Sequence, residues 1–155
     1  MGLILNTVAA ALTEDDWDFD ADEDREIIRT GVTAKNASYR MIFDAREDTE
    51  QLLLYLLCAY QVPDDRRLAA AEFMARANFG LVLGNFELDM EDGEVRYRVS
   101  IDIEGGELTN KMVRNMIGAG VVTLDRYFPG LMAVCYADRD PKEAVTEVEA
   151  EEDED

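Results

Sequence analysis

The 155-residue chain contains no histidine and only two cysteines. The missing imidazoles exclude Ser-His-Asp and Cys-His nucleophilic sites, together with zinc sites that need histidine. Cys58 and Cys135 form no CxxC motif and are too few for a disulfide framework or a structural zinc site. Because both lie in apolar stretches, we interpret them as small buried residues of a reducing compartment.

Several common functional motifs are missing as well. The sequence has no GxxxxGK[ST], GxGxxG or GxSxG pattern, which excludes the usual phosphate-binding loops and the nucleophile elbow of hydrolases. No apolar run is long enough to span a bilayer, and no lysine or arginine precedes the short apolar run Leu3–Leu12. We therefore expect no signal peptide, no cofactor and a cytoplasmic location.

Basic residues are scarce. Fifteen lysines and arginines oppose 35 acidic residues, which gives a net charge of −20. Glu14–Glu26 and Asp138–Asp155 each carry −8, so the rest of the chain is only mildly acidic. Binding to nucleic acid or to an anionic membrane depends on cationic side chains, and we expect neither partner.

The best-specified stretch is Asp64–Ile103, which predicts a helix, a glycine stop and a β-hairpin. Pro63 ends the preceding segment, and Asp64 or Asp65 is placed to cap the helix. Residues 69–77 contain five alanines, which are strong helix formers, and Asn78 and Gly80 provide the stop. This thin helix face suits packing on a sheet, or against a second helix across a dimer axis.

The hairpin predicts its own register. Residues 85–90 and 95–102 alternate apolar and polar side chains, and Asp92-Gly93 is a typical hairpin turn. A turn centred there predicts the cross-strand pairs Met90–Val95, Asp89–Arg96, Leu88–Tyr97 and Glu87–Arg98. A one-residue slip would move carboxylates into the core, so the alternation strongly constrains which side chains face inward.

The segments before this unit predict a helix and three strands. Residues 3–13 favour a short helix, and residues 16–26 fit an edge strand or an ordered lead-in. Residues 26–34 and 39–46 predict a second hairpin. Gln51–Val62 is apolar almost throughout, which fits either a buried helix or a strand covered on both faces. We predict a strand, because Pro63 and a clear helix follow and the hairpin needs a third partner.

The C-terminal part predicts a helix and a tail. Thr109 is placed to cap a helix that Pro129 should kink or divide, with a second piece over Leu131–Tyr136. The element order α-β-β-β-α-β-β-α predicts an α+β fold, with an antiparallel sheet of about five strands and helices on one side. We assign residues 1–137 to a single domain and the acidic residues 138–155 to a disordered tail.

Alternating aspartates suggest one alternative function. They are Asp16, Asp18, Asp20, Asp22 and Asp24. A calcium loop needs glycine at its sixth position and glutamate at its twelfth, and neither possible frame provides them. A divalent-cation-binding protein or a metal-assisted enzyme using the Asp16–Asp24 cluster remains the alternative hypothesis, although we assign no metal ligand. An acidic mimic that competes with nucleic acid for basic proteins is a third possibility.

Three sequence runs resemble the YbjN family of bacterial proteins: RLAAAEFMARANFGLVLGNFELDMEDGEVRYRVSIDI, LTNKMVRNMI and LDRYFPGLMAV. The resemblance covers roughly Arg25–Tyr136 and includes no catalytic motif. The family is described as regulators of sensory transduction. The resemblance implies a type III secretion chaperone-like fold, usually dimeric, that binds other polypeptides without catalysis.

In such chaperones the second helix and the following strand commonly form the dimer interface, which matches Leu68–Phe79 and Leu81–Met90 here. Our preferred hypothesis is therefore a non-enzymatic homodimer that binds another polypeptide. The candidate dimer or partner surface consists of Leu68, Ala71, Glu72, Ala75, Phe79, Phe86, Leu88, Arg96 and Arg98.

Overall fold

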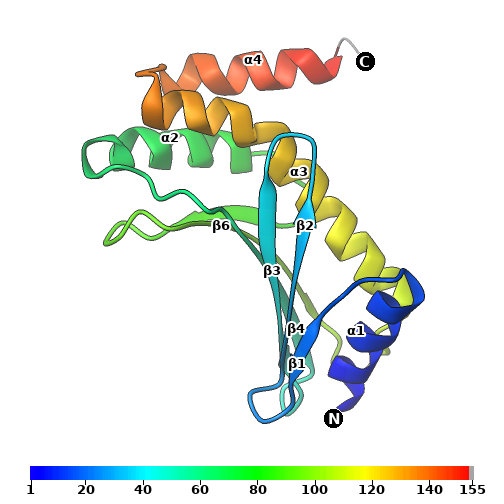
Figure 1. Cartoon of the computed structure of the whole chain (residues 1–155). Helices are drawn as coiled ribbons and strands as arrows, with labels where there is room; N and C mark the ends of the chain where they lie inside the picture. The colour runs from blue at the N-terminus through cyan, green and yellow to red at the C-terminus, as the bar shows by residue number, and fades with distance from the viewer. Residues whose placement is uncertain (154–155) are drawn as a thin grey trace.

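Six antiparallel strands form one twisted sheet, with the helices on one side of it (Figure 1). The structure, a computed structural model, describes residues 1–153. The strands are β1 (Asp20–Asp22), β2 (Ile27–Thr33), β3 (Ser38–Arg46), β4 (Gln51–Leu57), β5 (Asn85–Leu88) and β6 (Val95–Asp102), in the spatial order β1-β2-β3-β4-β6-β5. The predicted α+β class is confirmed. The sheet has six strands rather than about five, because the acidic β1 pairs with β2 as an edge strand.

The helices form two layers over the sheet. They are α1 (Leu3–Glu14), α2 (Arg67–Asn78), α3 (Asn110–Tyr136) and α4 (Pro141–Asp153), with a short 3₁₀ turn over Asp64–Arg66. Helix α3 packs on β4 and β6, α1 packs on β2 and β3, and α2 packs on β5. Helix α4 lies outside them and packs on α2 and α3 (Figure 1).

The core lies between the sheet and these helices. Strand β4 is central, and its alternate residues Leu52, Leu54 and Leu56 are fully buried against the helices. Strand alternation places Leu53 and Tyr55 on the opposite, helix-free face, where they are half-buried. The prediction of a strand over Gln51–Val62 is therefore confirmed for Gln51–Leu57, where β4 ends.

The predicted register of the hairpin formed by β5 and β6 is wrong by two residues. Leu88 pairs with Val95, and Phe86 with Tyr97. The loop is longer than the predicted turn because it is fixed from outside: the Val62 N–H donates to the Gly93 carbonyl at 2.8 Å. A shift of two residues leaves every side chain on its predicted face, so the division into core and outer residues survives.

The predicted cap of α2 is also wrong. Asp64 and Asp65 lie within the 3₁₀ turn, and α2 begins at Arg67. Within the described chain, neither cap position of these two elements makes a side-chain capping hydrogen bond. The side chain of Asp64 instead pairs with Arg67 at 3.0 Å.

Pro129 does not divide the last predicted helix, which continues as α3 to Tyr136 and bends along its length (Figure 1). Proline lacks an N–H, so the carbonyl of Asp125 four residues earlier loses its helical donor. The Nδ2 of Asn36, in the β2–β3 turn, donates to that carbonyl at 2.8 Å. The predicted cap at Thr109 is confirmed, since its hydroxyl accepts a 3.1 Å bond from the Met112 N–H.

The acidic tail is helical rather than disordered over Pro141–Asp153. Ala144, Val145 and Val148 share one helix face and are all less than 10 % exposed, because they pack on α2 and α3. Gly130 leaves the room for this contact: a Cβ there would lie 2.8 Å from Cγ2 of Val148. The acidic composition of this segment predicts disorder, but these three buried apolar residues hold it as a helix on the domain. Residues 154–155 of the predicted tail lie outside the described part of the chain.

Candidate functional site

Helix α2 carries an exposed stripe at helical spacing. Leu68, Glu72 and Ala75 follow one another at intervals of four and three, which places them on one face of α2. Phe79 directly follows the helix and lines the same groove as Glu72 and Ala75. All four are exposed, and Phe79 is 91 % exposed. We call these four residues the α2 stripe. Large exposed apolar side chains that recur along one surface are characteristic of interaction sites.

Two further apolar side chains extend this surface toward the sheet edge. Val82 and Leu83, in the loop between α2 and β5, are 91 % and 52 % exposed. Strand β5 that follows has no strand on its outer edge within the described sheet. The other side of the α2 stripe borders a groove of about 540 Å³ between α2 and α4, which includes Phe79 and Val145. The predicted interface helix thus presents a continuous surface from α4 to β5.

The remaining predicted surface residues do not join the α2 stripe. Ala71 and Leu88 are half-buried, and Phe86 is only 3 % exposed because its ring packs on Tyr97 with centroids 5.0 Å apart. Phe86 was therefore wrongly placed at a surface. Arg96 lies on the helix-free face of the sheet, where it pairs with Glu87 at 2.7 Å.

That helix-free face, which we call the open face, also carries Arg98. This arginine approaches Glu87 with its Nη2 at 3.5 Å. The pairing order adds three arginines that the sequence did not single out: Arg29 on β2, and Arg40 and Arg46 on β3. Their proximity depends on which strands are neighbours, and no local motif indicates it.

A buried carboxylate joins the β2–β3 turn to α3. Asp125 is 9 % exposed and accepts hydrogen bonds from the Tyr39 hydroxyl at 2.8 Å and from the Asn36 N–H at 3.0 Å. Burial, followed by the bond to Asp125, raises the pKa of Tyr39. These donors hold the Asp125 carboxylate beside the place where Pro129 removes one helical hydrogen bond of α3. We therefore assign this cluster a structural role.

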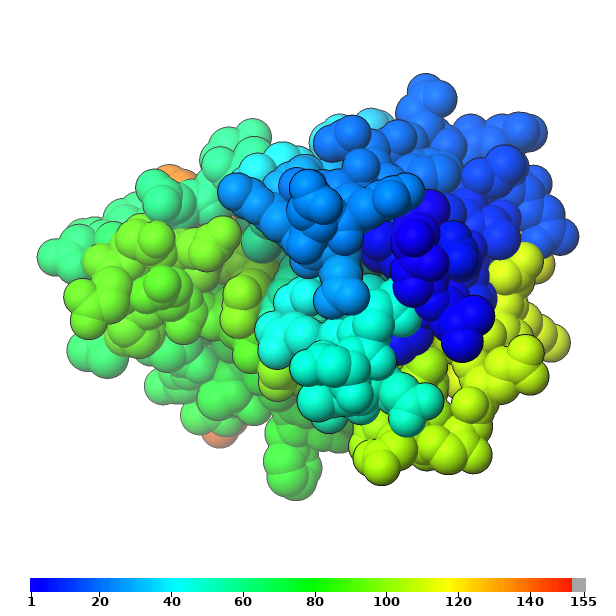
Figure 2. Space-filling model, turned by 90° about the horizontal axis from the view of Figure 1, so that it is seen from below, coloured from blue at the N-terminus to red at the C-terminus, as the bar shows by residue number. Residues whose placement is uncertain are grey.

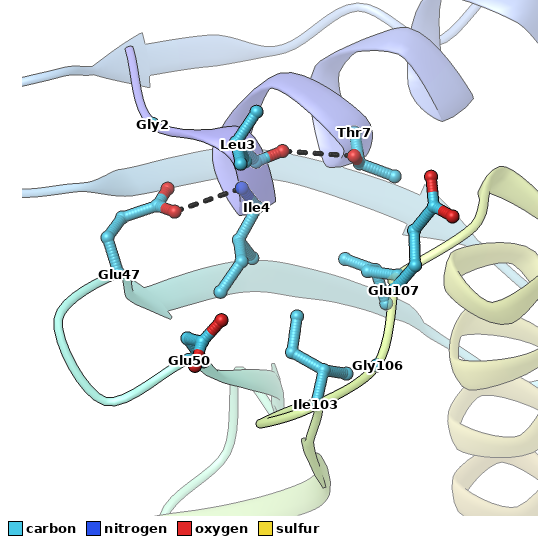
Figure 3. Close-up of a pocket in the computed structure, with 10 residues that line it drawn as sticks. Gly2, Leu3, Ile4, Thr7, Glu47, Glu50, Ile103, Gly106 and Glu107 are labelled. Carbon is cyan, nitrogen blue, oxygen red and sulfur yellow. Dashed lines mark hydrogen bonds between the residues drawn. The ribbon is translucent and has the colours of Figure 1, made fainter.

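A pocket of about 360 Å³ lies at the end of the molecule that holds the N-terminus (Figure 1). Figure 2 shows the N-terminal helix, the turn around residues 46–50 and the segment around residues 103–108 meeting at this end. Glu47 reaches from that turn to the start of α1, where its carboxylate accepts the N–H of Ile4 at 2.9 Å (Figure 3). It also accepts the N–H of Leu5 at 3.0 Å. Glu47 therefore caps α1, which has no capping side chain of its own. Glu50 and Glu107, at the mouth, are exposed.

The two cysteine thiols are buried and not activated. Burial raises the pKa of the Cys58 thiol to about 12 and that of Cys135 to about 11. A thiol protonated at neutral pH is a poor nucleophile and a poor metal ligand.

The Asp16–Asp24 cluster supplies no cation site in the structure. Within residues 1–153, no group of three or more Cys, Asp or Glu side chains is placed to hold a metal ion. Asp20 and Asp22 lie on strand β1, and each approaches an arginine at 3.8–3.9 Å.

Comparison with known protein families matches residues 5–132 to YbjN, described as "Putative bacterial sensory transduction regulator". The chain belongs to the YbjN family. The match leaves out the end of α3 and all of α4. Comparison with curated proteins finds none that matches.

Three solved structures resemble the chain. "Crystal structure of YbjN, a putative transcription regulator from E. coli" superposes with a TM-score of 0.59 at 13 % identity, covering 86 % of this chain and 90 % of that chain. The crystal structure of the ExsC-ExsE complex gives 0.50 at 14 %, covering 79 % and 90 %. The HopA1-SchA chaperone-effector complex gives 0.48 at 17 %, covering 80 % and 91 %. At these identities the likeness concerns the fold, and the predicted chaperone-like fold is confirmed.

The family description names a regulator, and the solved structures add the fold alone. Among the described residues, no helix is long and apolar enough to cross a membrane. The α2 stripe carries exposed apolar side chains, and the open face carries a group of arginines. The sequence predicted some of the residues on each surface. The loop residues Val82 and Leu83 were missed, although the apolar run from Leu81 to Leu83 next to a glycine was a usable signal.

Proposed function

We propose that this chain is a non-enzymatic, cytoplasmic, homodimeric module that binds another polypeptide. The α2 stripe with its extension over Val82 and Leu83 is the observation on which the dimer rests. A second copy is the occupant that best fits it, because a two-fold axis beside α2 would place the same exposed apolar residues of both copies against each other. The alanine at the centre of the stripe would let the two helices approach closely.

The energetics favour an interface that depends on few residues. Burying a leucine or phenylalanine side chain contributes roughly 1.5–3 kcal/mol. A two-fold axis uses each residue twice, so Leu68 and Phe79 alone provide four such contacts. This gain is large enough to offset much of the free-energy cost of association.

The non-enzymatic part of the proposal is supported by chemistry. The chain has no histidine, and its two cysteines are buried with raised pKa values. The family description names a regulator, and the ExsC-ExsE structure is a complex of two different polypeptides with a related fold. Free, buried cysteines support the cytoplasmic location.

Light scattering after size exclusion tests the dimer. We expect the unmodified chain to be a dimer at micromolar concentration. The double variant Leu68→Ser/Phe79→Ser should raise the dimer dissociation constant about a hundredfold or more, because it removes the apolar ends of the stripe. Val122→Ser is the matched control, since Val122 is 68 % exposed on α3 and lies outside the stripe. A double variant that remains dimeric at every concentration would refute the assigned interface.

A further inference from the structure

The open face concentrates arginines in two neighbouring rows. One row runs across the sheet through Arg40, Leu57 and Arg96, and the next through Arg29, Ile42, Tyr55 and Arg98. Side chains paired across antiparallel strands point to the same face, so these residues share one surface. Four of the fifteen basic residues of a chain with net charge −20 gather here.

Only two acidic residues, Glu87 and Asp20, lie within these two rows of the described sheet. The other carboxylates of the open face, Asp22, Asp44 and Asp102, lie beyond them, and Asp44 pairs with Arg46 at 3.0 Å. Glu87 pairs with both Arg96 and Arg98, and Asp20 approaches Arg29 only at 3.9 Å while being 80 % exposed. Arg40 makes no ion pair or hydrogen bond through its side chain within residues 1–153. The rows therefore carry surplus positive charge on an acidic molecule.

Arg98 has unused hydrogen-bonding capacity. Its Nε is buried and has no hydrogen-bond partner among the described residues. A buried donor without an acceptor is unfavourable, and a partner carboxylate at Arg98 would supply an acceptor.

An apolar strip separates the arginines. Leu53, Tyr55 and Leu57 lie along β4. Leu57 has Arg40 on one side and Arg96 on the other, Tyr55 lies between Ile42 and Arg98, and Leu53 lies between Asp44 and Ser100. Leu57 is only 7 % exposed although no helix covers this face, as expected where long arginine stems lie over a neighbour. The Arg96 guanidinium lies 4.3 Å from the centre of the Tyr55 ring. The strip is thus partly desolvated and flanked by cations.

The spacing fits a helix. Strands lie about 4.8 Å apart, so Arg40 on β3 and Arg96 on β6, two strands apart, are separated by roughly 10 Å. An α-helix with its side chains is about 10–12 Å wide, so one lying along β4 would meet arginines on both flanks. Because β4 is a central strand, an added strand has no free backbone edge to pair with there.

We propose that the open face binds an amphipathic helix of a partner polypeptide, whose apolar stripe contacts Leu53, Tyr55 and Leu57 and whose flanking carboxylates pair with Arg40, Arg96 and Arg98. This inference rests on the proposed function, since it names the kind of polypeptide that the module takes. A second copy of the chain is a poorer occupant, because two open faces would bring arginine rows together. Nucleic acid lacks the apolar stripe that would cover the strip along β4.

Fluorescence anisotropy with synthetic helical peptides tests the proposal. The probe is a fluorescein-labelled peptide with leucines at helical spacing i, i+3, i+4 and i+7 and glutamates on both flanks. The control probe has lysine in place of each glutamate. We expect the acidic probe alone to bind, with an affinity that falls as salt rises from about 50 to about 300 mM. Equal binding of both probes, or tighter binding of labelled duplex DNA, would overturn the proposal.

Charge-matched variants locate the site. Arg40→Gln/Arg98→Gln should raise the dissociation constant of the acidic probe about tenfold. Arg25→Gln/Arg76→Gln removes the same charge from exposed positions away from the open face and should leave it unchanged. An equal loss in both variants would indicate only non-specific attraction and refute the site.

Light scattering on the same variants separates this inference from the dimer. Arg40→Gln/Arg98→Gln should remain as dimeric as the unmodified chain. A dimer that binds no acidic probe would refute the open-face site alone. A monomer that binds the acidic probe through Arg40 and Arg98 would support the site while removing the dimer proposal.

Discussion

Replacing Val148 by alanine tests whether helix α4 is part of the folded domain. Val148 is 7 % exposed, and it fills the space that Gly130 leaves open beside the ring of Phe73. The substitution removes two methyl groups from this contact without introducing charge or disturbing helix geometry.

Two effects of this substitution lower the free energy of unfolding, and one raises it. Two buried methyl groups are worth about 1.6 kcal/mol of transfer free energy, and the unfilled space adds to the loss. The higher helix propensity of alanine returns about 0.5 kcal/mol. The free energy of unfolding should therefore fall by roughly 1 kcal/mol or slightly more, which lowers the melting temperature by about 2–4 °C in a chain of this size.

Differential scanning calorimetry of Val148→Ala beside Thr146→Ala measures this effect. Thr146 is exposed on the same helix, and its hydroxyl donates only to the Lys142 carbonyl one turn earlier. Thr146→Ala should keep or slightly raise the melting temperature, because alanine is the better helix former. If both variants melt together, α4 does not contribute to the domain and the packing argument fails.

Four further predictions follow from the site. Asp125→Ala should lower the free energy of unfolding by about 2–4 kcal/mol, because its donors lose their acceptor; calorimetry against Asp24→Ala measures this. Glu47→Ala should cost about 1 kcal/mol through loss of the α1 cap, read from urea denaturation. At pH 8, below the raised thiol pKa values, Cys58 and Cys135 should react with Ellman's reagent only after unfolding; rapid native labelling would contradict their burial. Calcium and magnesium should leave the melting temperature unchanged, and micromolar binding by calorimetric titration would restore the metal hypothesis for Asp16–Asp24.

Most of the fold was predicted from the local alternation of apolar and polar residues. The strands were predicted correctly because apolar and polar residues alternate over short stretches. The apolar stretch Gln51–Val62, which precedes Pro63, contains β4. The hairpin register failed because the loop is fixed by the backbone of Val62 and the side chain of Arg67, contacts that no local pattern reveals. The two-residue shift left the inward and outward faces intact.

The tail failed for a different reason. Its acidic composition predicts disorder, but Ala144, Val145 and Val148 have the spacing of a helix face, and the matching groove is created by Gly130 on another helix. Composition is an average, whereas docking depends on a few positions. Tertiary packing therefore overrode a compositional rule.

The sequence predicted part of the α2 stripe but could not predict the grouping of arginines on the open face. Leu68 and Phe79 were found because helical spacing and the resemblance both indicate the second helix. Phe86 was misplaced, since the interface was assigned by chain segment and not by face. Arg40 and Arg29 could not be grouped with Arg96 from the sequence, because their proximity requires the strand order of the whole sheet.

The association state of the unmodified chain is the most direct test of the central claim. Sedimentation equilibrium across a concentration series, from roughly one to one hundred micromolar, should fit a reversible dimer of the 17.5 kDa chain, with the dimer prevailing at the higher concentrations. A single monomeric species across the whole series would contradict the homodimer and leave the exposed α2 stripe unexplained.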